Sequence, residues 1–125
     1  DACLPHVFLG DFNSKPGDPQ YTMLVSGKSS SGFARLLKIL GGPPTKLRSA
    51  YAAVQGKEPA FTNYARTEWD ADPFVGTLDY IFYSREWHAT DVTELPKSHE
   101  DLPGPLPLRD EPSDHLLISA TLRMT

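Results

Sequence analysis

The chain has 125 residues, of which 39% are hydrophobic and 22% are charged, values that are typical of a single soluble globular domain. It contains no apolar stretch long enough to span a bilayer, and its single Cys3 excludes an internal disulfide and a cysteine-based zinc cluster. The net charge of −4 argues against broad, non-specific binding of nucleic acid through a basic surface.

The first predicted element is a buried strand over residues 6–10, where Val7, Phe8 and Leu9 form an apolar run. Turn-forming side chains follow it at residues 11–14. The chain starts without Met and enters this interior strand within a few residues. We therefore expect it to be a cut or processed part of a longer domain.

A short helix is predicted after this turn. Asp18 is suited to the N-cap, Pro19 to the first helical position and Gly27 to the end of the helix. Residues 33–40 carry apolar side chains at helical spacing and predict a second helix, which the following Gly-Gly-Pro-Pro sequence ends. No element is assigned to residues 47–53 or 61–64.

Residues 77–83 predict a strand because they are rich in β-branched and aromatic residues. Alternation places Leu78, Tyr80 and Phe82 on one face, and Asp79 on the other face among apolar residues. A carboxylate in such a strand costs several kcal/mol unless it is paired. We therefore expect Asp79 to have a partner.

The remaining third of the chain predicts two more strands separated by an irregular segment. The first strand is expected over residues 88–95, and the second over residues 115–123, where apolar residues alternate. Five prolines between residues 96 and 112 exclude regular structure there. No internal repeat and no domain boundary is present.

Three short motifs carry residues suited to chemistry: Gly10-Asp11-Phe12-Asn13, Leu78-Asp79-Tyr80-Ile81 and Ser113-Asp114-His115. Each has an ordinary structural explanation when it stands alone. The first is a good turn sequence, an aspartate in a strand can accept structural hydrogen bonds, and Asp-His can be a loop pair. Their joint occurrence in this order is a much stronger signal than any one of them.

In this order and these contexts the motifs resemble those of the endonuclease/exonuclease/phosphatase superfamily. The closer resemblance is to the carbon catabolite repressor type of deadenylase and its relatives nocturnin, Angel and the 2′-phosphodiesterase. It rests on Gly10-Asp11-Phe12-Asn13-Ser14 with Pro16-Gly17, on Phe61-Thr62-Asn63-Tyr64, on the segment from Gly76 to Ser84, and on Pro112-Ser113-Asp114-His115. The resemblance implies an α/β fold, with this chain forming half of a two-sheet β-sandwich flanked by helices.

The family's chemistry gives each motif residue an expected role. Phosphodiester hydrolysis needs an activated water, a cation and donors for the oxyanion, so Asp11 is expected to orient that water or hold a metal, and Asn13 to donate to the phosphate. Their spacing of two predicts that both side chains lie on one side of an extended segment. His115 is expected to contact the phosphate, and Asp79 to hold its other ring nitrogen and raise its pKa.

Three further residues are assigned by resemblance. Asp114 is expected in the site as a metal ligand together with Asp11, and Asn63 near the phosphate or sugar. Phe74 has two interpretations, stacking on a base or simple core packing. The chain departs from the family by the additional residues 66–72 between Asn63 and Asp79, and by lacking the first half of the domain with its main metal-binding glutamate.

We therefore expect residues 1–125 to be the C-terminal part of one catalytic domain that requires Mg²⁺, with Mn²⁺ as an alternative. The expected activity is 3′-exoribonucleolytic release of AMP from poly(A) RNA. Alternatives are hydrolysis of a dinucleotide 2′-phosphate or of 2′,5′ or 2′,3′-cyclic linkages, and a non-catalytic interaction module or truncated product.

The expected partners are an RNA 3′ end or nucleotide and the N-terminal half of the domain, without which this chain should be inactive. The expected location is the cytoplasm, with the nucleus and mitochondrion as alternatives.

Overall fold

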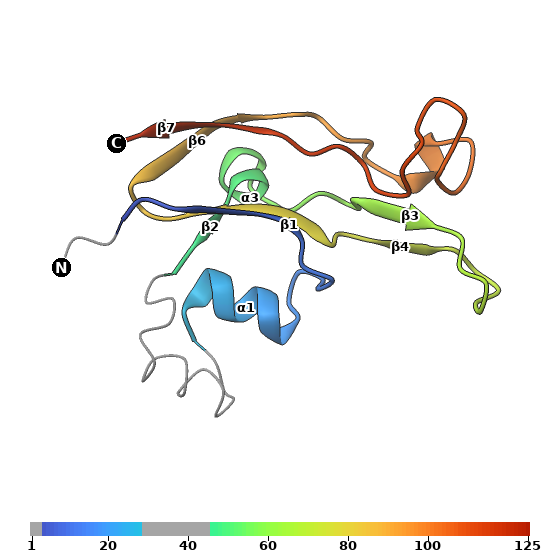
Figure 1. Ribbon diagram of the computed structural model, residues 1–125, viewed down its shortest axis with the longest axis horizontal. Helices are drawn as coiled ribbons and strands as arrows, with labels where there is room; N and C mark the ends of the chain where they lie inside the picture. Colours follow the sequence, from blue (N-terminus) through green and yellow to red (C-terminus); the bar gives the residue numbers. More distant parts are fainter. Residues whose placement is uncertain (1–3, 29–45) are drawn as a thin grey trace.

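The computed structural model describes residues 4–28 and 46–125 (Figure 1). The strands form three small antiparallel sheets. The first contains β1 (Val7–Asp11), β5 (Asp79–Tyr83) and β2 (Arg48–Ser49), in the order β1-β5-β2. The second pairs β3 (Asn63–Ala65) with β4 (Phe74–Gly76), and the third pairs β6 (Trp87–Val92) with β7 (Ala120–Met124). The helices are α1 (Pro19–Ser26), α3 (Ala50–Gln55) and the 3-10 turn η1 (His99–Asp101). Mixed strands with few helices agree with the expected class, and the two-sheet sandwich remains a prediction.

Strand β5 is the centre of the fold, since it carries apolar side chains on both faces. Tyr80 and Phe82 pack on one face against α1, while Ile81 and Tyr83 pack on the other face against α3 and the β6–β7 ribbon. Figure 1 shows α1 on one side of the β1-β5-β2 sheet and α3 with β6–β7 on the other side. Burial of each such side chain stabilises the fold by about 1.5–3 kcal/mol. The predicted alternation of residues 77–83 is thus confirmed.

The predicted short helix is present as α1, with Asp18 as N-cap, Pro19 in the first turn and Gly27 as C-cap. Gly27 adopts a left-handed conformation with φ 65°, which glycine tolerates best. The second predicted helix, over residues 33–40, lies outside the described residues. Among the described helices, none has the length and apolar content needed to cross a membrane.

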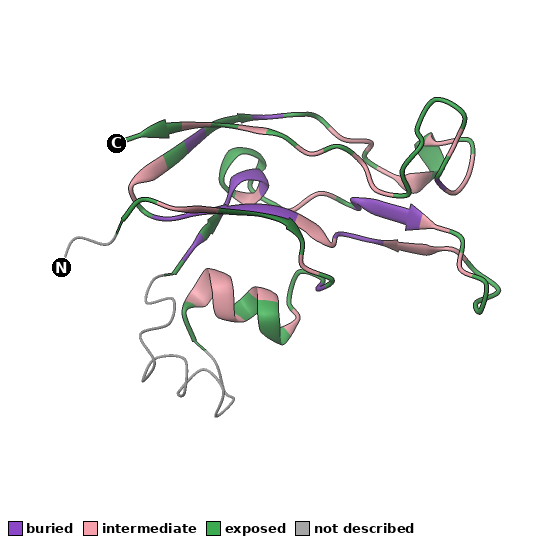
Figure 2. Ribbon diagram, in the orientation of Figure 1, coloured by how far each residue is buried: buried purple, intermediate pink, exposed green. Residues whose placement is uncertain are grey.

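Strand β1 differs from the prediction of a buried strand. It pairs with β5 along one edge, yet Phe8 is 47% exposed and Leu9 is 70% exposed. Within the described residues no strand pairs with its other edge, and Figure 2 shows most of β1 as exposed. An apolar run therefore identified the strand correctly, but it does not reveal what covers the strand.

The last predicted strand begins later than expected. Strand β7 starts at Ala120, whereas residues 115 and 116 bond to the β3 region through an isolated bridge from His115 to Asn63 and a 2.7 Å hydrogen bond from the Leu116 N–H to the Thr62 carbonyl. The predicted strand is therefore divided: residues 115–116 bond to the β3 region, and residues 120–124 pair with β6. Strand β6 likewise ends at Val92, before the predicted residue 95.

Two unassigned segments contain regular structure. Residues 48–55 form β2 and α3, and Asn63 begins β3. After α3 the carboxylate of Glu58 accepts hydrogen bonds of 2.8 Å from the Tyr21 hydroxyl and 2.9 Å from the Ser49 hydroxyl, and so links α1 to β2. Burial raises the pKa of Glu58, and the two hydrogen bonds offset part of that rise.

The raised pKa of Glu58 predicts that this residue makes folding less favourable as the pH rises. Because the folded state holds the proton more tightly than the unfolded state, stability is lost as pH climbs above the ordinary value of 4.5. We expect Glu58→Gln to reduce the pH dependence of the free energy of unfolding above pH 4.5, measured by urea titration at a series of pH values. The exposed Glu111→Gln is the matched control and should keep the wild-type slope. Equal slopes for Glu58→Gln and wild type would contradict this.

Candidate active site

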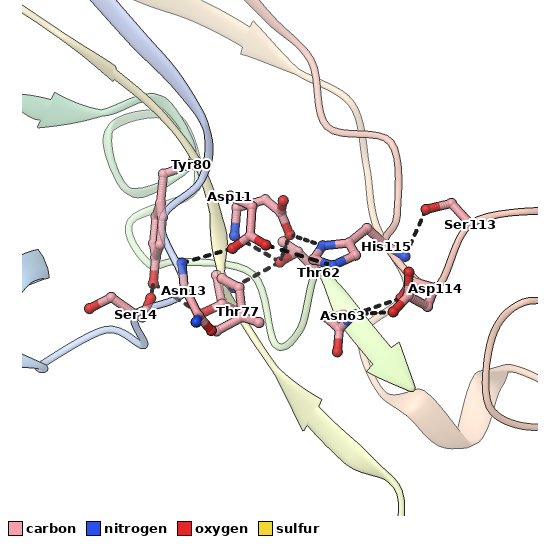
Figure 3. Close-up of polar contacts among 12 residues, drawn as sticks. Asp11, Asn13, Ser14, Thr62, Asn63, Thr77, Tyr80, Ser113, Asp114 and His115 are labelled. Carbon is pink, nitrogen blue, oxygen red and sulfur yellow. Dashed lines mark hydrogen bonds and ion pairs between the residues drawn. The ribbon is translucent and has the colours of Figure 1, made fainter. Parts of the chain in front are cut away.

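The three sequence motifs meet where β1 ends and β5 begins. Asp11 and Asp79 are direct partners in the β1–β5 register. His115 is brought beside them because its neighbours bond to β3: the Tyr64 N–H donates to the Asp114 carbonyl at 3.2 Å, and Leu116 bonds to Thr62. Figure 3 shows Asp11, Thr62 and His115 converging from these separate segments. Residues more than 100 positions apart in the chain thus form one cluster.

His115 lies between two carboxylates. Its Nδ1 is 2.7 Å from Asp79 Oδ2, and its Nε2 is 3.9 Å from Asp11 Oδ2. The first contact is the partner that the buried charge of Asp79 required. Because a carboxylate accepts at Nδ1, that nitrogen carries a proton and Nε2 faces Asp11.

The environment of His115 favours its charged form. Burial by itself lowers the pKa of His115, but the hydrogen bond to Asp79 and the negative charges of Asp79, Asp114 and Asp11 outweigh it and leave the pKa raised. The imidazole therefore remains protonated to higher pH than a free histidine.

Thr62 is a site residue that the sequence did not reveal. It is fully buried, and its hydroxyl donates to Asp79 Oδ2 at 2.6 Å while accepting the backbone N–H groups of Leu78 at 2.9 Å and Asp79 at 3.1 Å. One donor and two acceptor positions use the full capacity of a hydroxyl. The only available signal was its place beside Asn63 in an aromatic-rich segment, and buried threonines are too common for that to be specific.

Asp11 and Asn13 lie on a turn, so the expected extended segment is wrong. Asn13 has φ 46°, a left-handed conformation that asparagine adopts more readily than most residues, and its N–H donates to Asp11 Oδ1 at 2.7 Å. The turn holds one oxygen of Asp11 and leaves Oδ2 toward His115. Both side chains are exposed.

Asn63 and Asp114 form a pair beside this cluster. The buried Asn63 amide donates to the Asp114 carbonyl at 3.0 Å and to its Oδ2 at 3.3 Å. Among the described residues the acidic and histidine side chains that converge within 4.8 Å are Asp11, Asp79 and His115. The structure therefore places Asp114 next to the cluster and does not bring it in.

Phe74 shares a strand face with Asn63. Asn63 pairs with Gly76 and Ala65 with Phe74, so all four positions point to one side of the β3–β4 hairpin. The opposite side carries Tyr64 and Val75, which pack on Phe61 and Leu106 in the third core cluster. Phe74 belongs to none of the core clusters in the described ranges.

The donor set suits a hard divalent cation in part. The Asp11 side chain is 48% exposed, no hydrogen bond reaches its Oδ2 from the described residues, and such cations prefer carboxylate oxygens. Asp79 Oδ2 already accepts from both Thr62 and His115. Asp11 Oδ2 is therefore the less engaged of these two carboxylate oxygens.

The family model for the endonuclease/exonuclease/phosphatase family matches residues 1–115, and the chain belongs to that family. Among curated relatives, carbon catabolite repressor protein 4 homolog 4 of Arabidopsis thaliana is 40% identical over 94% of this chain. The CCR4-Not complex 3'-5'-exoribonuclease subunit Ccr4 of Aspergillus terreus is 34% identical over 94%, and 2',5'-phosphodiesterase 12 of Bos taurus is 33% identical over 96%. The chain spans 27%, 18% and 20% of these relatives, respectively.

Removal of the Thr62 hydroxyl should destabilise the protein and loosen Asp79. Thr62→Val keeps the shape but leaves two backbone N–H groups without a partner and removes one of the two donors to Asp79 Oδ2, which should cost about 1–3 kcal/mol in the free energy of unfolding. Thr62→Ser keeps the hydroxyl and should retain most of that stability. Denaturant unfolding of both variants checks this, and equal loss in the two would show that the methyl group matters instead.

Replacement of the Asp79 charge should lower the pKa of His115. Asp79→Asn removes the strongest favourable contact of the imidazolium, so the effect of burial should prevail. An NMR titration of the ring protons measures the shift. Asp114→Asn, which removes a more distant charge, should lower this pKa less. An unchanged midpoint in Asp79→Asn would refute the assigned cause.

Proposed function

We propose that the protein hydrolyses phosphodiester bonds with Mg²⁺, and that it acts as a 3′-exoribonuclease that releases AMP from poly(A) RNA. The observation that carries the proposal is the position of His115 between Asp79 and Asp11, at 2.7 Å and 3.9 Å. Two of the relatives named above support it, because their names specify a 3'-5'-exoribonuclease and a 2',5'-phosphodiesterase.

His115 and Asp11 would have different roles at the scissile phosphate. A protonated His115, oriented by Asp79, donates from Nε2 to a phosphate oxygen on which charge develops. Asp11, whose Oδ1 accepts the Asn13 N–H, would use Oδ2 either to accept a hydrogen bond from the attacking water or to hold a metal. The exposed Asn13 amide is suited to donate to phosphate or sugar oxygens. Asn63 would have to release one of its two hydrogen bonds to Asp114 before it could donate in the same way.

Asp11 is the residue of this chain proposed to hold the cation, and Mn²⁺ suits the same oxygen ligand. When bound, the cation would offset negative charge on the phosphate in the transition state. Asp114 would have to give up its contact with Asn63 to contribute. The main glutamate ligand expected from the family resemblance would come from outside this chain.

We further propose that the rest of the domain covers β1 in the full-length protein. Leu9 is 70% exposed on a strand with a free edge among the described residues, and such edges are normally paired or covered. The three relatives reported above are several times longer than this chain. Activity is therefore assigned to the full-length protein.

The His115→Ala variant tests this proposal in the full-length protein. Loss of the proton donor should lower kcat/KM by at least about a hundredfold with Mg²⁺ present. The substrates are oligoadenylate, a dinucleotide 2′-phosphate and an RNA with a 2′,3′-cyclic phosphate, and oligoadenylate should be cleaved fastest by the wild type. His99→Ala is a control outside the cluster. Unchanged turnover in His115→Ala would refute the site, and preference for another substrate would replace the exoribonuclease assignment.

A further inference from the structure

The aromatic ring of Phe74 lies across a glycine. A Cβ placed on Gly76 would be only 2.9 Å from Phe74 Cζ and 3.3 Å from Lys15 Cε. Both side chains therefore occupy space that any residue other than glycine would fill. This space is on the face of the β3–β4 hairpin that also carries Asn63.

Lys15 reaches this face from the loop that holds Asp11. Its ammonium nitrogen lies 4.9 Å from the centroid of the Phe74 ring, a cation–π contact. The base of the side chain is fixed, because the Lys15 N–H donates to Asp18 Oδ2 at 2.7 Å and the preceding Ser14 carbonyl accepts from the buried Tyr80 hydroxyl at 2.7 Å. Lys15 as a whole is exposed, and its ammonium forms no ion pair with a carboxylate in the described residues.

Lys15 places a positive charge at the border of an acidic site. Asp11, Asp79 and Asp114 surround His115, so an anionic substrate would meet repulsion there unless cations compensate. Gly76 pairs with Asn63 and its carbonyl accepts the Thr62 N–H at 3.0 Å, so Lys15, whose Cε lies 3.3 Å from the Cβ position of Gly76, is next to the residues that border the cluster.

We propose that Lys15 binds a second phosphate of the substrate, adjacent to the scissile one, and thereby favours oligonucleotides over substrates with a single phosphate. This inference rests on the proposed function and names a residue for substrate selection. An exposed cation–π contact is weaker than a charge-assisted hydrogen bond to phosphate, so the ammonium moves from the ring to the phosphate when substrate binds. The movement also frees the Phe74 ring to contact a base.

A charge-deletion cycle on the full-length protein tests this role. Two triadenylates are compared with Mg²⁺ present, one fully charged and one with a neutral methylphosphonate at the linkage next to the scissile bond. In the wild type the charged substrate should have a kcat/KM roughly tenfold higher, the effect of one charged hydrogen bond. In Lys15→Met, which keeps an apolar side chain of similar length, this ratio should fall to about one.

The possible results distinguish binding of the second phosphate by Lys15, a purely structural role of Lys15, and failure of the proposed activity itself. Lys97→Met, an exposed lysine elsewhere in the chain, should keep the wild-type ratio. A wild-type ratio in Lys15→Met, or an equal loss on both substrates, would overturn the inference, since the second result means that Lys15 only holds the Phe74 ring. Cleavage of neither triadenylate by the wild type would overturn the proposed function and this inference together.

Discussion

The carboxylate of Asp79 sets the conditions for the rest of this structure. It belongs to β5, a strand with apolar side chains packed on both faces, where an unpaired charge would cost several kcal/mol. Its hydrogen-bond partners are supplied by Thr62, just before β3, and by His115, beyond the proline-rich segment. One buried charge thus requires three distant parts of the chain to adopt a single arrangement.

The same requirement orders the site before substrate arrives. Thr62 fixes the carboxylate, the carboxylate fixes the imidazole, and the β1–β5 register places Asp11 on the far side of that imidazole. Each contact is held by strand pairing or by a buried side chain rather than by a free loop. The long-range contacts that stabilise the fold are therefore the contacts that position its chemistry.

The sequence predicted the parts of this arrangement that depend on local pattern or on an unmet physical need. The helix α1 follows from its caps, the two faces of β5 from alternation, and the partner of Asp79 from the cost of its charge. The position of His115 followed from the resemblance. These features can be predicted because they depend on the residues in the same segment.

Other features of the structure cannot be predicted from the local sequence. The role of Thr62 depends on three hydrogen bonds to residues 16 and 17 positions away, and the exposure of Leu9 depends on what lies beside β1. The turn at Asn13 replaced an extended segment because the Asp11 carboxylate captures the backbone N–H. In each case tertiary contacts or a side-chain hydrogen bond decided what the pattern left open.

The hairpin of β3 and β4 has a consequence for how this protein can change in length. Its two faces differ: Tyr64 and Val75 belong to the core, whereas Asn63 and Phe74 lie on the opposite face. Insertion of one residue within either strand would exchange the faces, since side chains alternate with a period of two. Residues 66–73 connect the strands outside their register. This connection can change in length without altering the register of either strand, so the additional length between Asn63 and Asp79 is accommodated away from the site.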